Sequence, residues 1–337
     1  MRIEQSLTKE FAKDQEFESY LSLLNSSLCE IEESLYKELE EEYPTIHIIG
    51  TARSGTTLLT QVISTYLKVG YINNLIAAFW KAPLFGIQLS KRLLGQGYQS
   101  SFTSFFGRTA NVYEPHEFTY FWNYHLAYPD LQQKGAEHEK NISWDILKKV
   151  LLNMTNMLER PLLFKSVLLG FHSNHLFQIL PKTCFIYIKR NYIDNAISLL
   201  KYREKMLGSV DLWVSLKPLQ YNWLKNEDIY VQVVGQILFL EHEYLEQLKT
   251  IPDANKLFVS YEEVCNNTEK VVIQVKEMIR TQGFSCTVDT PPVVPFTVIE
   301  SSKKADQALV SRLEAAYSML KSKYPYLDSF NTFSSPV

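Results

Sequence analysis

A glycine-bounded loop, Gly50-Thr-Ala-Arg-Ser-Gly-Thr-Thr57, is the segment of this chain best suited to bind an anion. It lies between a short β-branched run and a helical pattern, so it should connect a strand to a helix. The backbone N–H groups of such a loop, and of the first turn of the helix, bind phosphate or sulfate oxygens. Arg53 adds a positive charge inside the loop, and Thr56 and Thr57 add hydroxyl donors.

The loop has the spacing of the phosphate loop of nucleotide hydrolases, but Thr56 stands where that loop has a lysine. A magnesium-dependent enzyme would also need a carboxylate at the end of a neighbouring strand. The neighbouring predicted strands carry Lys165 and Arg190 instead. Together with Arg53, these cations favour sulfuryl over phosphoryl transfer, because a sulfuryl group carries less negative charge and needs no divalent ion. An arginine and a lysine can stabilise the departing bridging oxygen.

At these residues the chain resembles the sulfotransferases that use 3′-phosphoadenosine 5′-phosphosulfate (PAPS). The loop from Gly50 resembles the family's 5′-phosphosulfate loop, in its Arg-Ser-Gly-Thr-Thr form. Phe164-Lys-Ser166 resembles the strand with the catalytic lysine. Residues 185–198 resemble the 3′-phosphate block, with an arginine at the strand end and a serine eight residues later. Residues 259–264 are similar to a weaker segment that follows a late strand, and all four segments occur in the family's order.

The resemblance implies a PAPS-dependent sulfotransferase that produces a sulfate ester and adenosine 3′,5′-bisphosphate by direct in-line attack, without a metal. Lys165 would stabilise the leaving oxygen, and Arg190 and Ser198 would bind the 3′-phosphate. The residues that would bind the 5′-phosphosulfate are those of the loop: Arg53, Ser54, Gly55, Thr56 and Thr57. A surface ion pair between Arg190 and Asp194 is the alternative without a ligand.

The family's C-terminal Gly-x-x-Gly-x-x-Lys segment is absent. Ser301, Ser302 and Lys303 are the candidates for the adenosine contacts that it would make, with Ser302 as the principal choice. The absence argues against the branch that sulfonates phenols and steroids.

A base should lie near the acceptor hydroxyl, which must lose its proton as it attacks sulfur. Glu117 is the first candidate, because Glu114-Pro-His-Glu117 resembles the Pro-x-Glu-aromatic segment of some bacterial carbohydrate and glycolipid sulfotransferases. We expect Glu117 to open a helix after Pro115. His116, Glu114 and His172 remain alternatives, and so does a purely helix-capping role for Glu117.

By the same resemblance, the acceptor is a saccharide or glycolipid rather than a phenol. The aromatic residues over 113–128 suit stacking on a sugar, although their helical spacing is more typical of a core. The stretch 79–92 combines apolar residues with Lys81, Lys91 and Arg92, which suits either a packed helix or peripheral membrane contact with a lipid-linked acceptor. A magnesium-dependent kinase and a non-catalytic nucleotide-binding protein are the alternative functions.

The elements that position these residues alternate along the chain. Four short β-branched or aromatic runs predict buried strands, at 45–49, 162–166, 184–188 and 256–260. Helical patterns separate them, including one over 5–40. This alternation predicts an α/β fold with a central parallel sheet flanked by helices, a P-loop-like sulfotransferase fold. We expect one domain over 1–337, with an N-terminal helical segment over 1–43 and a helical insertion over about 74–156.

Composition and net charge exclude several classes of protein. The 337 residues are 46% hydrophobic and 21% charged, which excludes a disordered chain. A net charge of −3 disfavours nucleic acid as a partner and a polybasic membrane tether. Four separated cysteines predict reduced thiols and no zinc site. No apolar run reaches the about 18 residues of a membrane span, so we expect a cytoplasmic protein. The oligomeric state is not indicated.

Overall fold

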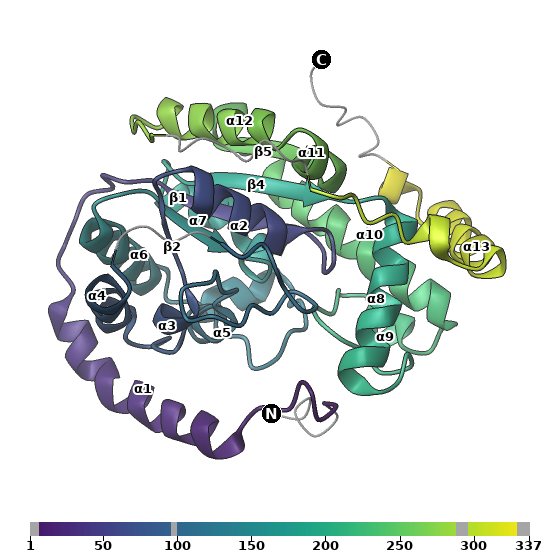
Figure 1. Cartoon of the computed structure of the whole chain (residues 1–337), viewed down its shortest axis with the longest axis horizontal. Helices are drawn as coiled ribbons and strands as arrows, with labels where there is room; N and C mark the ends of the chain where they lie inside the picture. The colour runs from purple at the N-terminus through teal and green to yellow at the C-terminus, as the bar shows by residue number, and fades with distance from the viewer. Residues whose placement is uncertain (1–6, 96–99, 288–295, 329–337) are drawn as a thin grey trace.

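The computed structural model describes residues 7–95, 100–287 and 296–328. Its described residues contain one five-stranded sheet in which every pairing is parallel, in the order β2-β3-β1-β4-β5 (Figure 1). The strands are β1 Thr45–Ile49, β2 Gly70–Tyr71, β3 Leu162–Lys165, β4 Cys184–Lys189 and β5 Lys256–Ser260. The predicted α/β class is confirmed, and so are the four predicted strands. Only the two-residue β2 was missed, because it is too short to show a pattern.

The register of the sheet brings the candidate residues to one edge. In β1, Ile48 lies opposite Lys165 of β3, and Ile49 lies opposite Tyr187 of β4. Because parallel strands end at the same edge, the loop after β1 lies between Lys165 and the end of β4. This edge is where α/β proteins bind ligands.

Helices cover both faces of the sheet, as the alternation of strand residues requires. Ile46 and Ile48 of β1 belong to one buried cluster, with residues of α2 and α12. Ile49 belongs to a second buried cluster, with residues of α6, α7 and α10. The helices are α1 Gln15–Leu35, α2 Thr56–Tyr66, α3 Asn74–Ala77, α4 Pro83–Leu93, α5 Thr119–His125, α6 Trp144–Leu158, α7 Ser173–Ile179, α8 Tyr192–Leu207, α9 Tyr221–Leu224, α10 Ile229–Leu248, α11 Tyr261–Asn266, α12 Thr268–Thr281 and α13 Gln307–Lys323. The short 3₁₀ helices are η2 Ala136–Asn141, η3 Leu169–His172, η4 Asp253–Asn255, η5 Ser302–Lys304 and η6 Pro325–Asp328.

The N-terminal helix is shorter than its sequence pattern indicates. Helix α1 begins after Asp14, whose side chain accepts the N–H groups of Glu16 and Phe17, and it ends at Leu35. The glutamate-rich residues that follow are not helical and contact other elements instead: Lys37 N donates to Asn153 Oδ1 at 3.0 Å, and Glu41 accepts from Lys182 N at 3.0 Å. Buried Glu32 of α1 accepts the N–H of Leu84, at the start of α4, at 2.6 Å.

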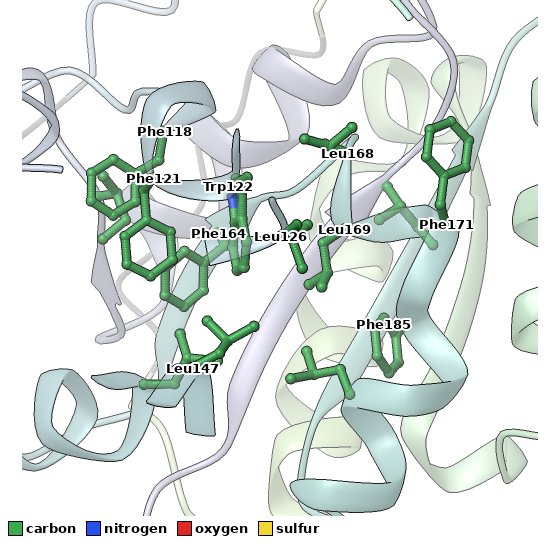
Figure 2. Close-up of a cluster of buried hydrophobic side chains, with 14 of the residues drawn as sticks. Phe118, Phe121, Trp122, Leu126, Leu147, Phe164, Leu168, Leu169, Phe171 and Phe185 are labelled. Atoms are coloured by element: carbon green, nitrogen blue, oxygen red, sulfur yellow. The ribbon is translucent and has the colours of Figure 1, made fainter. Parts of the chain in front are cut away.

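The segment over 74–156 is less helical than expected. Helices α3 to α5 lie within it and α6 begins in it and ends at Leu158, but residues 100–118 form no helix. Its aromatic residues are largely core. Phe118, Phe121 and Trp122 are at most 1% exposed, and Trp122 packs edge-on against Phe164 of β3 (Figure 2). These three aromatic residues therefore belong to the core, as their helical spacing indicated. An exposed ring such as Tyr124 is still available to stack on a sugar.

Candidate functional site

The loop between β1 and α2 needs its two glycines. A Cβ on Gly50 would lie 2.5 Å from the carbonyl O of Ile188, so no other residue fits there without movement. Gly55 has φ 106°, and a Cβ there would lie 2.7 Å from the Tyr261 ring. Arg53 is also left-handed, with φ 69°. This conformation is costly for a residue with a side chain, and it is often held in place at functional sites.

Arg53 is the residue on which the other candidates converge. Its Nε donates to Ser198 Oγ of α8 at 3.2 Å. Its carbonyl O accepts from Arg190 Nη1, also at 3.2 Å. The junction between β4 and α8 therefore brings Arg190 and Ser198 to the same loop residue, although they are eight positions apart. Burial lowers the pKa of Arg53, and the like charge of Arg190 acts in the same direction.

Arg190 spans from the loop to the C-terminal part of the chain. Its Nη2 donates to the carbonyl O of Ile299, and its guanidinium lies 4.6 Å from the centre of the Tyr261 ring. Its Nε is buried and has no hydrogen-bond partner among the described residues. Arg190 and Asp194 do not form the alternative ion pair, and Asp194 Oδ1 instead accepts the backbone N–H of Ser302 at 2.6 Å. Ser302 therefore lies next to α8, close to the segment that Arg190 contacts.

Lys165 forms the second half of the site. Its Nζ donates to Thr57 Oγ1 at 3.1 Å and pairs with Glu117 Oε2 at 2.8 Å. The lysine side chain is 9% exposed and that of Glu117 is 34% exposed, so the carboxylate is the more accessible partner. The structure therefore brings a candidate base and a candidate leaving-group cation into direct contact.

Glu117 does not open a helix, contrary to expectation. Helix α5 begins at Thr119, and Phe118 before it is left-handed, with φ 58°. The N–H of Phe118 donates to His116 Nδ1 at 2.8 Å, which stabilises this bend. Glu117 thus projects from an irregular segment instead of a helix terminus.

The other three candidate bases are engaged elsewhere. Glu114 is 1% exposed and accepts from Gln61 Nε2, Ser100 Oγ and Ser101 N, which gives it a structural role. His116 accepts at Nδ1, so its neutral ring carries the proton on Nε2 and has no free acceptor. His172 contacts Tyr128 OH with Nε2 and Glu139 with Nδ1. The geometry favours Glu117.

A turn that was not predicted from the sequence covers the loop. Phe105 and Arg108 exchange backbone hydrogen bonds of 2.8 and 3.0 Å, with Gly107 at φ 87° between them. A Cβ on Gly107 would lie 3.5 Å from both Arg53 Nη1 and Thr57 Oγ1. The Phe-Phe-Gly-Arg sequence was a signal for a turn, but no local pattern shows what a turn will cover.

Asn195 of α8 was also missed as a supporting residue. Its side-chain Nδ2 donates to Thr51 Oγ1 at 2.9 Å, and both residues are buried. This contact ties the start of the phosphate-binding loop to the helix that carries Ser198. Ser54, the next loop hydroxyl, is fully buried, and its Oγ has no partner among the described groups.

The site is positively charged. Arg53, Lys165 and Arg190 lie at the loop, and Glu117 pairs with Lys165. Within the described ranges, no group of three histidine, cysteine or acidic side chains is arranged to hold a metal ion. Among the same residues, none of the helices has the length and apolar character to cross a bilayer. The cysteines are free thiols, and three of them are buried: Cys184, Cys265 and Cys286.

One family model and several solved structures are similar to this chain. The family model described as "Sulfotransferase family" matches residues 44–282. Sulfotransferase STF1 of Mycobacterium tuberculosis H37Rv is 14% identical, with a TM-score of 0.49 over 95% of this chain and 87% of that one. Sulfotransferase STF9 of Mycobacterium avium is 11% identical, with a TM-score of 0.43 over 90% and 73% of the two chains. A search of curated proteins finds no match. The family match covers well over half of the chain and contains the loop, Lys165, Arg190 and Glu117, so the chain belongs to the sulfotransferase family.

Proposed function

We propose that this sulfotransferase takes its sulfuryl group from PAPS and transfers it to a hydroxyl of a saccharide or glycolipid. The observation that carries the proposal is the contact between Glu117 and Lys165, 2.8 Å apart, beside the anion-binding loop. It supplies a base and a cation at one point, which is what removal of a hydroxyl proton and stabilisation of a leaving oxygen require.

The buried polar atoms of the site fit a donor with two anionic ends. The Oγ of Ser54 and the Nε of Arg190 are both buried donors without partners among the described residues. Such groups are costly unless a ligand satisfies them. In our proposal the loop residues bind the 5′-phosphosulfate, while Arg190, Ser198 and Ser302 bind the 3′-phosphate end. The loop residues in question are Arg53, Ser54, Gly55, Thr56 and Thr57.

The chain's own residues then divide the chemistry between them. PAPS supplies an activated sulfuryl group on a phosphate leaving group. Glu117 takes the proton of the acceptor hydroxyl as the new S–O bond forms and the bond to the bridging oxygen breaks. Lys165 stabilises the charge that develops on that oxygen, helped by Thr57, which already contacts its ammonium group. No covalent enzyme intermediate and no bound metal take part in this scheme.

The saccharide or glycolipid acceptor is the finer part of the proposal. It is supported by the Pro-His-Glu-Phe segment that places Glu117. On helix α4, Leu89 and Leu93 are 39% and 69% exposed next to Lys91 and Arg92. An apolar and basic surface of this kind suits peripheral contact with the membrane that holds a lipid-linked acceptor.

A thermal-shift panel tests the donor. Adenosine 3′,5′-bisphosphate should raise the melting temperature more than ADP does, with or without magnesium, because only the former has a 3′-phosphate for Arg190. Stabilisation by ATP that depends on magnesium would instead favour a kinase. Radiolabelled PAPS offered with saccharides, glycolipids and simple phenols then identifies the acceptor. Transfer to phenols alone would contradict the acceptor assignment without affecting the donor assignment.

A further inference from the structure

Two aromatic rings from distant parts of the chain lie against the Arg53 side chain. Phe106 comes from the turn over the loop, and Tyr202 comes from α8. Their rings are stacked, with centres 5.6 Å apart and planes 11° apart. The guanidinium carbon of Arg53 lies 5.3 Å from the Phe106 ring and 5.6 Å from the Tyr202 ring. Both distances are within the range of cation–π attraction.

Helix α8 contributes two different contacts to this one guanidinium. Ser198 and Tyr202 are four residues apart, so they lie on the same side of the helix. Ser198 accepts the Nε hydrogen of Arg53, and Tyr202 presents a ring to the guanidinium. The other two guanidinium nitrogens of Arg53, Nη1 and Nη2, are not used in the hydrogen bond to Ser198. Arg53 Nη1 lies by the tip of the turn, close to Thr57 and Lys165, as the space around Gly107 shows.

The turn that carries Phe106 is itself held by the N-terminal segment. Phe11 is 2% exposed and stacks on Phe105, with ring centres 5.2 Å apart. Arg108 Nη1 donates to the carbonyl O of Phe11 at 3.1 Å, and its guanidinium lies 5.1 Å from the Phe11 ring. These contacts with Phe11 hold the turn, and therefore the Phe106 ring next to Arg53, in place.

The aromatic pair stabilises the Arg53 charge without neutralising it. Within residues 7–95, 100–287 and 296–328, no carboxylate lies within ion-pair distance of Arg53. A carboxylate would cancel the charge that an anionic donor needs, whereas aromatic faces attract a guanidinium and leave its N–H groups free at the edge. Holding the side chain in advance also removes the entropy cost of ordering it when the donor binds.

We propose that Phe106 and Tyr202 are positioning residues, which hold the Arg53 guanidinium in place for the 5′-phosphosulfate of the donor. This inference rests on the proposed function for the identity of the donor. In this role the pair acts through its contacts with Arg53. Its loss should therefore weaken donor binding more than it slows the chemical step.

Steady-state kinetics with Tyr202→Leu test the role. We expect the KM for PAPS to rise about five- to thirty-fold, the range of one partly desolvated cation–π contact, with kcat changed less than about three-fold. Tyr202→Phe should keep the KM for PAPS at the wild-type value, because the ring of Tyr202 makes the contact with Arg53. In an Arg53→Ala background, Tyr202→Leu should have almost no further effect. A fully additive double variant would overturn the proposal.

Tyr230→Leu is the matched control. Tyr230, on α10, also packs against an arginine, but this one is Arg312: its guanidinium lies 5.4 Å from the Tyr230 ring, and its Nη1 donates to the Tyr230 hydroxyl at 3.3 Å. Its replacement should leave the donor KM unchanged. An equal rise in both variants would show that loss of any such ring weakens the fold, and would contradict a specific role for Tyr202.

Chemical labelling tests the inference without any donor. Phenylglyoxal modifies accessible arginines, and mass spectrometry locates the modified residue. Arg53 should react several-fold faster in Tyr202→Leu than in the wild type or in Tyr202→Phe. An unchanged rate would refute the positioning role even if PAPS proves to be the donor. A faster rate would support it even if the wild type fails to use PAPS, which would count against the proposed function alone.

Discussion

Replacing Glu117 with glutamine separates proton transfer from donor binding. Glutamine has the same shape and can still contact Lys165, but it cannot accept a proton from the acceptor hydroxyl. General-base catalysis contributes about 10²- to 10⁴-fold, or about 3–5 kcal/mol of barrier, so kcat should fall by that factor. The fold should be retained, because the Glu117 side chain is 34% exposed.

The same substitution should not weaken donor binding, and should even strengthen it. At 2.8 Å the Glu117–Lys165 pair has a Coulomb energy of about 6 kcal/mol at an effective dielectric constant of 20, before the loss to solvent at the exposed carboxylate. Removal of that carboxylate leaves the charge of Lys165 available to an anion. The dissociation constant for adenosine 3′,5′-bisphosphate should therefore stay equal or fall.

The assay combines single-turnover transfer from radiolabelled PAPS with calorimetric titration of adenosine 3′,5′-bisphosphate. Glu114→Gln is the matched control, because Glu114 lies three residues away but accepts hydrogen bonds from Ser100 and Ser101 in the interior. It should lower the melting temperature and leave the pH dependence of kcat unchanged. If Glu117→Gln keeps kcat within about three-fold of the wild type, Glu117 is not the base.

Four further predictions concern single residues. Arg190→Ala should erase the preference for the 3′-phosphorylated nucleotide, about ten-fold or more in calorimetric affinity, and an unchanged preference would refute its role. Lys165→Ala should lower kcat about 10²- to 10³-fold in the transfer assay while adenosine 3′,5′-bisphosphate still binds; retained kcat would exclude it as the leaving-group cation. Burial lowers the pKa of His47 to about 3, below the unfolded value of about 6.5, so its contribution to stability is present above pH 6.5 and is lost as the pH falls toward 3. His47→Gln should remove this slope, up to about 1.4 kcal/mol per pH unit, from urea unfolding curves between pH 4 and 6; an equally steep slope in the variant would contradict this account. Glu32 gives a pH dependence of stability in the opposite direction, because burial raises its pKa to about 7. Its contribution to stability is present below pH 4.5 and is lost as the pH rises from about 4.5 to 7. Glu32→Gln should therefore reduce the pH dependence of the urea unfolding midpoint over that range; an unchanged dependence would contradict this account.

Local sequence was sufficient for the elements that position the site. The run Thr45–Ile49 is mostly β-branched and is buried, and Gly50 and Gly55 bound the loop that follows it. These signals depend on a few neighbouring residues, so they can be read without knowledge of the fold. The same holds for the order of the segments that resemble sulfotransferases.

Local pattern was less reliable where contacts to other elements decide the outcome. The pattern over 5–40 predicts one long helix, but the helix ends at Leu35. Among the aromatic residues of 113–128, Phe121 is fully buried while Tyr124 is 43% exposed, although both are on α5. Burial of this kind follows from what packs against each face of the helix, which the segment itself does not contain.

Which residues meet at the site was decided by the tertiary structure alone. The sequence made Glu117 the first candidate for the base and left Glu114 as an alternative, and it is the fold that buries Glu114 among hydroxyl groups and places Glu117 on Lys165. Arg53 contacts Ser198 from 145 positions away, and it meets Phe106 and Tyr202 only because a turn and a helix cover the same loop. Residue type and spacing determine which chemistry a chain is able to perform. The order of strands in the sheet determines which of its groups come close enough to perform it.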